Sequence, residues 1–562
     1  MKKQSRVMIC AALMTTPMWV PGQAVPAQAN PVDILVHAGQ TMGKYAPDWN
    51  YFGADEPNYL YTPDGRKLLG ELHDLSKGPV YYRPHNLLTT GDGEGSLKWG
   101  STNAYTEKLD GTAAYDWTIT DKIFDALKIA GVRPLVEVGF MPEALSTHPE
   151  PYRHDFPKGS VFTGWSYPPK DYEKWGALVG AYAAHLKERY GADTDGWLWE
   201  VWNEPDIGYW HGTPEEYDRL YDVTTAAIRK VLPGAKVGGP SATGISSDKA
   251  EHMLRQFLEH CASGKNAATG EVGAPLDFVS YHPKGDPKFV DGHVEMSLGT
   301  QLRSTERGMK IIASYPQWKR TPILLTETDP EGCAACKGPQ NGYRNGPLYG
   351  VSVAEAMARI DQLGRKYGVN LQGGVTWAFT FEGQPSFAGF RELATNGVDK
   401  PVLNVFRMYG KLDGDWVKTS SSGAIGLEEM LKDGVGANSD IDAIATRSEH
   451  RVSVLAWNYS DVDLPAAAVP IRMMVDGLPG KLPKGSMKLR EFRMDDTHSN
   501  AYAVWKKMGS PERPTPEQTA ALERAGCLES LGPERIVEAN DGRLVVPISL
   551  PRQGVSLVTI TW

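Results

Sequence analysis

Between Val80 and Phe381 the sequence alternates between short apolar runs and longer segments with helical periodicity. The runs are rich in β-branched and aromatic residues, as strands are, and they cover residues 80–83, 134–139, 198–202, 235–238, 277–281, 323–326 and 374–378. The segments between them, such as 171–190, repeat large apolar residues at the helical spacing. Apolar strands separated by helices form parallel sheets with helices outside. Eight such units over about 300 residues predict a closed (β/α)8 barrel.

The eighth strand is predicted as the second in order, between Ala104 and Tyr115, where Asp110-Gly111 interrupts the run. After Val402 the strand-like runs are split by Gly and Pro turns, which is typical of an antiparallel β-sandwich. Helical segments interrupt this region over 497–527. We therefore predict an α/β fold in which residues 79–401 form the TIM barrel and residues 402–562 form a β-sandwich with a helical insertion. Residues 30–78 lead into the barrel, and 32–36 can add a strand to the sandwich.

The first 29 residues have the pattern of a secretory signal peptide. Lys2, Lys3 and Arg6 give a positive start, residues 7–20 are mostly apolar, and Ala27-Gln28-Ala29 offers small residues at a cleavage site. No later segment is long and apolar enough to span a bilayer. We therefore expect an exported protein without a membrane span, located in a bacterial periplasm or outside the cell.

Export also bears on two cysteines. Cys333 and Cys336 form a Cys-Ala-Ala-Cys sequence shortly after Glu327. No second Cys-x-x-Cys and no close His pair completes a zinc site. An oxidising compartment favours a local disulfide over the alternative of two free thiols.

The net charge of −9 argues against nucleic acid as a partner, because no basic excess is present to replace phosphate counterions. The chain is rich in aromatic residues, with 16 Trp and 24 Tyr. Flat aromatic faces pack against the C–H faces of sugars, although core filling is the commoner use. The bulk composition thus permits a carbohydrate partner and disfavours a nucleic acid.

Two glutamates stand where predicted barrel strands end. Glu204 lies in Trp-Asn-Glu-Pro-Asp (202–206) after the fourth strand, and Glu327 lies in Thr-Glu-Thr-Asp (326–329) after the seventh. The C-terminal ends of barrel strands form the rim where active sites lie. Two carboxylates facing each other there can run a double displacement at an anomeric carbon. Taken singly, Glu204 can instead cap a helix and Glu327 can form a rim salt bridge.

Residues near these glutamates can shift their pKa values or donate hydrogen bonds that orient them. Asn203 can bond a sugar 2-hydroxyl, and Tyr281 and His282 are the expected hydrogen-bond donors to Glu327. Glu200 is expected on the same inward face as Glu204. It can either raise the pKa of Glu204 by repulsion or form a buried pair with Arg83.

Four further residues are candidates for substrate binding, each with a structural alternative. His85 can bond a substrate hydroxyl, or it can be a histidine satisfied within the core. Lys284 and Arg391 are cations on rim loops that can bind a sugar hydroxyl or carboxylate, or pair with nearby acids. Trp377 can stack under the sugar ring, or it can fill the core.

Several motifs resemble glycoside hydrolase family 39, the family of retaining β-xylosidases and α-L-iduronidases. They are Arg-Pro-His-Asn (83–86), Gly-Phe-Met-Pro (139–142), Trp-Asn-Glu-Pro-Asp, Ser-Tyr-His-Pro-Lys-Gly (280–285), Thr-Glu-Thr-Asp-Pro (326–330) and Lys-Pro-Val-Leu-Asn (400–404). The resemblance covers nearly the whole mature chain. It implies that Glu204 is the acid/base and Glu327 the nucleophile, in a barrel with a β-sandwich and with no metal or other cofactor.

Within that family, the Cys-Ala-Ala-Cys loop and the helical insertion look most like proteobacterial β-xylosidases. We therefore expect an exo-acting enzyme that releases xylose from the non-reducing ends of xylooligosaccharides. Lys284-Gly285, Asp329-Pro330 and Arg391 resemble positions that hold a uronate carboxylate in iduronidases, but Ile207 stands where their pattern has His. The alternatives are a hydrolase of α-L-arabinosides or α-L-iduronides, and a non-catalytic carbohydrate-binding protein.

Overall fold

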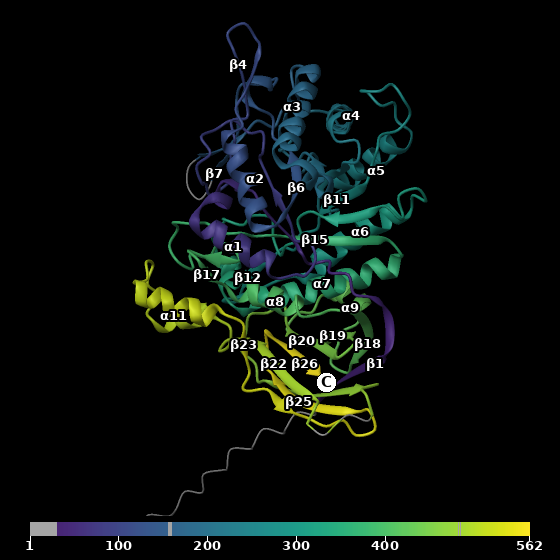
Figure 1. Ribbon diagram of the computed structural model, residues 1–562, viewed down its shortest axis with the longest axis vertical. Coiled ribbons are helices and arrows are strands. Elements are labelled where there is room, and N and C mark those ends of the chain that lie inside the picture. Colours follow the sequence, from purple (N-terminus) through teal and green to yellow (C-terminus); the bar gives the residue numbers. More distant parts are fainter. Residues whose placement is uncertain (1–30, 156–159, 481–482, 484) are drawn as a thin grey trace, which may run out of the picture.

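The computed structural model describes the chain apart from residues 1–30, 156–159, 481–482 and 484. The predicted signal peptide lies outside the described residues. In Figure 1 the barrel with its helices occupies the upper part of the molecule and a large β-sheet the lower part. No helix in the described part of the chain is long and apolar enough to cross a membrane.

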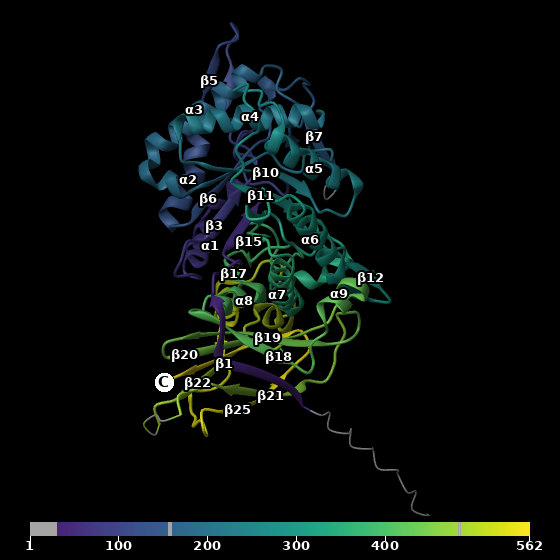
Figure 2. The ribbon, with the colours of Figure 1, turned by 90° about the vertical axis from the view of Figure 1, so that its right-hand side faces the viewer.

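Eight parallel strands close into a barrel, and each is followed by a helix, as predicted. The strands are β2 (Tyr51–Ala54), β3 (Tyr81–Pro84), β6 (Arg133–Val138), β9 (Leu198–Val201), β10 (Lys236–Thr243), β11 (Phe278–His282), β14 (Pro322–Leu325) and β15 (Asn370–Trp377). The helices are α1 (Pro63–His73), α2 (Thr118–Ala130), α3 (Tyr172–Tyr190), α4 (Pro214–Val231), α5 (Asp248–Ser263), α6 (Leu298–Ala313), α7 (Pro347–Tyr367) and α8 (Pro401–Tyr409). Figure 2 shows these helices around the strands.

The predicted position of the eighth strand was wrong. Residues 104–115 contain a separate hairpin of β4 (Tyr105–Glu107) and β5 (Ala113–Tyr115), whose turn is formed around Asp110-Gly111. The missing strand is β2, which is first in order and pairs with β3 and β15. Its four residues include a glycine, so its strand signal is weak. The barrel therefore begins at Tyr51, within the segment assigned to 30–78, and its last helix ends at Tyr409.

The C-terminal domain is a ten-stranded sheet that folds over itself. Its inward side chains form one apolar cluster with members from strands near both ends of the strand order, such as β22 and β25. The expected N-terminal strand is β1 (Val32–Lys44), which pairs with β18 (Asp415–Ser421) and, in parallel, with β21 (Val469–Asp476). The other strands are β19 (Asp440–Ser448), β20 (Arg451–Tyr459), β22 (Lys488–Met494), β23 (Glu529–Ser530), β24 (Arg535–Ile536), β25 (Leu544–Leu550) and β26 (Gly554–Thr561).

Shorter elements complete the two domains. The helical insertion consists of α10 (Ala501–Lys507) and α11 (Pro516–Gly526), and α9 (Leu427–Asp433) packs against α6. Three further small hairpins are β7 (Tyr152–Asp155) with β8 (Ser160–Gly164), β12 (Lys288–Val290) with β13 (His293–Glu295), and β16 (Ala394–Thr395) with β17 (Val398–Asp399). Short 3₁₀ helices cover Pro57–Tyr61, Glu143–Leu145, Gly191–Gly196 and Pro339–Asn345.

Candidate active site

Glu204 and Glu327 converge at the C-terminal ends of β9 and β14. One oxygen of each carboxylate and one ring nitrogen of His282 all lie within 4.8 Å of one another. Paired carboxyl groups stand about 5–5.5 Å apart in retaining glycosidases and about 6.5–9.5 Å apart in inverting ones. The short separation leaves no room for a water molecule between the second carboxylate and the sugar, which inversion would require, so the pair has the geometry of retention.

The turn after β9 directs Glu204 into the site. Trp202 and Glu204 both have left-handed backbone conformations, with φ of 68° and 47°. Such conformations are costly for residues other than glycine and gather at functional sites. The Glu204 backbone N–H donates to the Ser241 carbonyl at 2.8 Å, which ties this turn to β10.

Arg83, at the end of β3, is fully buried and connects the two catalytic strands. Its Nε donates to Glu200 at 2.5 Å and its Nη1 to Glu327 Oε1 at 3.2 Å. Its Nη2 donates to Asn203 Oδ1 at 2.9 Å. Glu200 is therefore paired with Arg83, which was one of its two predicted roles, and Asn203 is held beside Glu204.

Lys284 is the second cation at Glu327. Its Nζ donates to Glu327 Oε2 at 2.7 Å and to Asp329 Oδ2 at 2.8 Å. With Arg83 on the other oxygen, both oxygens of Glu327 have a charged donor. This arrangement stabilises the ionised form of Glu327.

The two carboxyl groups have opposite pKa shifts. Burial and the negative charge of Glu327 raise the pKa of Glu204 to about 8. Burial alone would also raise the pKa of Glu327, but the charges of Lys284 and Arg83 lower it to about 2. At neutral pH Glu204 therefore holds a proton and Glu327 is a carboxylate. Two acids with separated pKa values are the arrangement that acid catalysis with a nucleophile requires.

His282 faces the pair from β11. Its Nδ1 lies 2.9 Å from Glu204 Oε1 and 3.6 Å from Glu327 Oε1, so its main partner is Glu204 and not Glu327. Its Nε2 faces the hydroxyls of Ser241 and Thr326 at 2.9 and 3.1 Å. Burial lowers the pKa of His282 to about 4, so the ring is neutral at pH 7.

The expectation that Tyr281 aims Glu327 is corrected by the structure. The Tyr281 hydroxyl donates to the Thr305 carbonyl in α6, at 2.9 Å. Adjacent residues of a strand point to opposite faces, so His282 and Tyr281 cannot both face the barrel interior. Tyr281 therefore packs the barrel wall against α6.

Two other predicted binding residues are buried behind the site. His85 lies between the carboxylates of Asp55 and Glu137, at 2.9 and 2.8 Å, and is fully buried. Trp377 is 2% exposed, and the Arg83 guanidinium lies 4.9 Å from its ring centroid. The packing also explains Gly53, since a Cβ there would lie 2.5 Å from the Trp377 ring.

Arg391 is fully buried as well, so the expectation of a substrate-binding cation is corrected. It pairs with Asp329 at 2.5 Å and Glu331 at 2.8 Å, and it donates to the Trp377 carbonyl at 2.5 Å. Because Asp329 in turn accepts from Lys284, Arg391 acts on the site through these two residues. Of the predicted cations, Lys284 is thus the one at the reacting carboxylate.

Cys333 and Cys336 are joined by a disulfide, with Cα atoms 5.4 Å apart. The loop between them is tied to the same network. The Arg344 guanidinium donates to the carbonyls of both cysteines at 2.6 Å, and the Arg391 backbone N–H donates to the Ala334 carbonyl at 2.7 Å. The disulfide therefore supports the loop that follows Glu327.

Sequence reasoning missed Asp55 and Lys98, an ion pair beside His85. Both are nearly buried, and the charge of Lys98 acts to lower the pKa of Glu204, against the effect of burial and Glu327. Asp55 directly follows β2, so it was overlooked with that strand. Lys98 lies in the long loop after β3, where periodicity gives no signal.

Glu204, His282 and Glu327 also offer three ligand atoms with the spacing of a metal site. Arg83 and Lys284 contact the same carboxylate and supply two positive charges, which repel a divalent cation. The residues around this group therefore fit an acid–nucleophile pair better than a metal.

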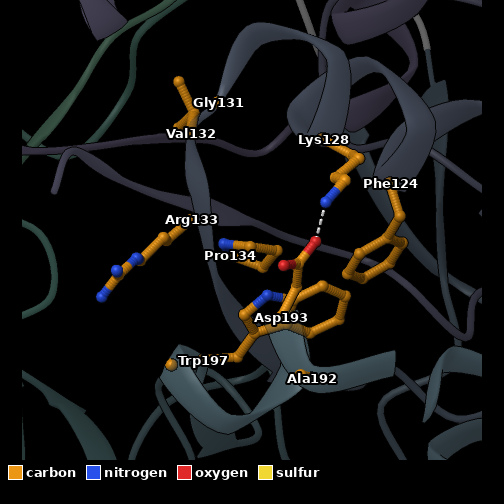
Figure 3. A pocket seen from close by; sticks show the side chains of 10 residues that line it. Phe124, Lys128, Gly131, Val132, Arg133, Pro134, Ala192, Asp193 and Trp197 are labelled. Atoms are coloured by element: carbon orange, nitrogen blue, oxygen red, sulfur yellow. Dashed lines mark hydrogen bonds and ion pairs between the residues drawn. The ribbon is translucent and has the colours of Figure 1, made fainter. Parts of the chain in front are cut away.

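A separate cavity of about 290 Å³ lies near the start of β6 and contains none of these residues. Figure 3 shows Phe124, Arg133 and Trp197 around it, with Lys128 paired to Asp193. Active sites of (β/α)8 barrels lie at the other ends of the strands. This cavity is therefore not the candidate active site.

Comparisons with known proteins agree with this geometry. The model for glycosyl hydrolases family 39 matches residues 36–527. A β-xylosidase of Caldicellulosiruptor saccharolyticus is 28% identical over 545 residues, which is 94% of this chain and 98% of that protein. An α-L-iduronidase of Mus musculus is 26% identical over 378 residues, which is 61% of this chain and 55% of that protein. A crystal structure of a monomeric β-xylosidase from Caulobacter crescentus CB15 has the same fold, with a TM-score of 0.72, 23% identity, and coverage of 94% of this chain and 99% of that one.

Proposed function

The chain belongs to glycosyl hydrolase family 39, and we propose that it is a retaining, exo-acting β-xylosidase that releases xylose from the non-reducing ends of xylooligosaccharides. The observation that carries the proposal is the Glu204–Glu327 pair, whose oxygens lie within 4.8 Å and whose protonation states differ at neutral pH. The two glutamates divide the work of a double displacement between them.

In the first step Glu327 attacks the anomeric carbon, and the bond between that carbon and the leaving oxygen breaks. Glu204 gives its proton to the leaving oxygen, so the alcohol departs neutral. The product is an ester between the sugar and Glu327. Lys284 and Arg83 keep Glu327 ionised until it attacks, because each donates to one of its oxygens.

In the second step Glu204 takes a proton from water, and the resulting hydroxide oxygen attacks the anomeric carbon and releases Glu327. The exchange of roles follows from charge. Once Glu327 is esterified, its negative charge no longer raises the pKa of Glu204, which then stays deprotonated and can act as a base. Two inversions at the same carbon give net retention.

Asn203 is the residue that we assign to the sugar 2-hydroxyl. Its Oδ1 accepts a hydrogen bond from Arg83, and this contact fixes the orientation of the amide. The Nδ2 group is then left to donate to the 2-hydroxyl. A bond to the 2-hydroxyl strengthens as the ring gains positive charge. It therefore stabilises the transition state more than the bound substrate, and so it lowers the activation free energy.

The choice of a neutral pentose over a uronate rests on the cations of the site. A uronate carboxylate needs a cation that is free to pair with it. Lys284 already contacts Glu327 and Asp329, and Arg391 is buried against Asp329 and Glu331. A relative that covers 94% of this chain is named as a β-xylosidase, whereas the iduronidase of Mus musculus matches 61% of it.

A panel of nitrophenyl or methylumbelliferyl glycosides tests the glycon. We expect the β-D-xyloside to have the highest kcat/KM, at least about tenfold above the α-L-arabinoside and the α-L-iduronide. A higher kcat/KM on either competitor would replace the proposed substrate. Sugar binding without turnover of any glycoside would favour a non-catalytic binding protein.

We further propose that the protein is exported. The positive start, apolar stretch and Ala27-Gln28-Ala29 of the N-terminus support this, as does a disulfide between Cys333 and Cys336. Fractionation of the producing cells, followed by N-terminal sequencing, tests it: the mature chain is expected outside the cytoplasm and to begin at Asn30. A full-length chain in the cytoplasm would contradict it.

A further inference from the structure

The sheet domain carries a groove of about 210 Å³ that is lined by four cations. They are Lys411, after α8, Arg451 in β20, and Lys488 and Arg490 in β22. Thr559 and Thr561 of β26 lie between them. The charge of this groove is thus opposite in sign to the net charge of the chain, which is −9.

The strand register builds this groove. β26 lies between β22 and β20, and Thr561 pairs with Lys488 on one side and with Arg451 on the other. Two residues earlier, Thr559 pairs with Arg490. Residues two apart in a strand share a face. Thr561 is therefore flanked by cations on both neighbouring strands, and Thr559 has Arg490 on one side and Ser453 on the other.

The acids around the groove do not balance these cations. Glu534 contacts Lys488 at 3.2 Å and Arg490 at 3.5 Å, and such long, exposed pairs contribute little. Asp413 contacts Arg451 at 2.5 Å but is shared with Lys77. Five cations, the four of the groove and Lys77, thus share only the two carboxylates of Glu534 and Asp413, among the described residues.

Lys411 is the cation with the least compensation. Among the residues that the structure describes, no carboxylate lies within ion-pair distance of its Nζ, which stands 5.0 Å from the Phe492 ring centroid. Burial and the nearby charges of Arg451 and Arg490 lower the pKa of Lys411. An anion in the groove would supply the opposite charge that Lys411 lacks.

We propose that this groove is an oxyanion-binding site, which takes a carboxylate or a phosphate group of a small ligand. Guanidinium forks match the oxygens of both groups, a lysine adds a point charge, and the Thr561 hydroxyl can donate to a remaining oxygen, whereas the Thr559 hydroxyl donates to the Arg490 carbonyl. The site lies on the sheet domain, contains no residue of the catalytic barrel strands, and does not rest on the proposed hydrolase function.

Calorimetric titration of the full mature protein at low ionic strength tests the proposal, with glucuronate and inorganic phosphate as probes and glucose as the uncharged control. We expect at least one of the two anions to bind, no binding of glucose, and weaker binding as salt is added. The stronger anion identifies the source of the oxyanion, a carboxylated sugar or a phosphate. Absence of binding by both anions would overturn the proposal.

Variants locate the binding. Lys411→Met and Arg490→Gln should each weaken the anion about tenfold, since each removes a charged hydrogen-bond donor. Lys418→Gln removes an exposed lysine elsewhere on the sheet and should leave binding unchanged, and so should Lys284→Met, which excludes the catalytic pocket. Arg490 is exposed, so Arg490→Gln keeps the test valid even if Lys411→Met fails to fold. Equal affinity in the protein and in both groove variants would contradict the assignment.

Discussion

The Nζ atom of Lys284 lies 2.7 Å from Oε2 of Glu327, the carboxylate that we assign as the nucleophile. The same Nζ is 2.8 Å from Asp329, which Arg391 holds from behind. The ionisation of Glu327 thus depends on a chain of ion pairs that runs from the fully buried Arg391 through Asp329 and Lys284. The protonation state of the catalytic pair follows from this chain, and it can be measured.

Lys284→Met should raise the pKa of Glu327, because it removes the cation that lowers it most. A glycosidase nucleophile must be ionised, so the acidic limb of the kcat/KM profile should move to higher pH, and kcat/KM at neutral pH should fall about 10²-fold. Lys288→Met removes an exposed lysine of the same rim loop and serves as the control. An unmoved acidic limb would show that Lys284 does not set this pKa.

Activity should fall above about pH 8, because Glu204 must be protonated for the first step and its pKa is raised to about 8. Glu204→Ala should lose about 10²–10⁴-fold on xylosides with poor leaving groups, which need protonation. With a dinitrophenyl leaving group the loss should be much smaller, and the decline above pH 8 should disappear. Equal losses on both substrates would argue against the acid role.

Cys333→Ser should lower the free energy of unfolding by about 2 kcal/mol, as loop-closure entropy predicts for a loop this short. Arg344 and Arg391 still bind the backbone of the loop, so kcat should change less than twofold. Denaturant unfolding and initial rates measure the two effects, with Cys527→Ser, an exposed free cysteine, as the control. A large fall in kcat at unchanged stability would show that the disulfide positions the site.

Glu355→Gln should stabilise the protein at pH 8. Glu355 in α7 contacts Arg359, which also contacts Asp440 and Asp442 of the sheet domain. Burial raises the pKa of Glu355 well above its usual value, so the folded protein keeps a proton that the unfolded chain releases. Stability therefore decreases as pH rises above the unfolded pKa of about 4.3, and glutamine removes this decrease.

Thermal unfolding at pH 5 and pH 8 measures the effect of Glu355→Gln. We expect the melting temperature of the variant to exceed that of the parent at pH 8 and the difference to shrink at pH 5. Glu428→Gln, an exposed acid of α9, is the control. A lower melting temperature of the Glu355 variant at both pH values would mean that Glu355 is ionised in the folded state.

The barrel and its two glutamates could be predicted because each signal is local. Short apolar and aromatic runs followed by Glu204 and Glu327 define both the strands and the rim. β2 could not be predicted so easily, since its four residues include Gly53, which is required by the Trp377 ring and not by strand propensity. Because β2 was not predicted, Asp55, which directly follows it, was not predicted either.

The remaining differences depend on contacts between distant segments. Tyr281 and His282 are adjacent in the sequence, so one of them must face the barrel interior and the other the helices. The register of β11 in the barrel decides which side chain points inward. Arg391 and Trp377 were expected at the substrate, and they are instead covered by residues that are far away in the sequence. Such burial is a property of packing, so no local pattern reports it.

Covalent trapping tests the central claim most directly. A 2-fluoro-β-xyloside with a good leaving group slows both steps, but the second step most, so the glycosyl ester should accumulate. Mass spectrometry of the digested protein should then place one fluoroxylosyl group on Glu327, with none in Glu327→Gln, whose turnover should be abolished. A label on another carboxylate, or full activity of Glu327→Gln, would contradict the account.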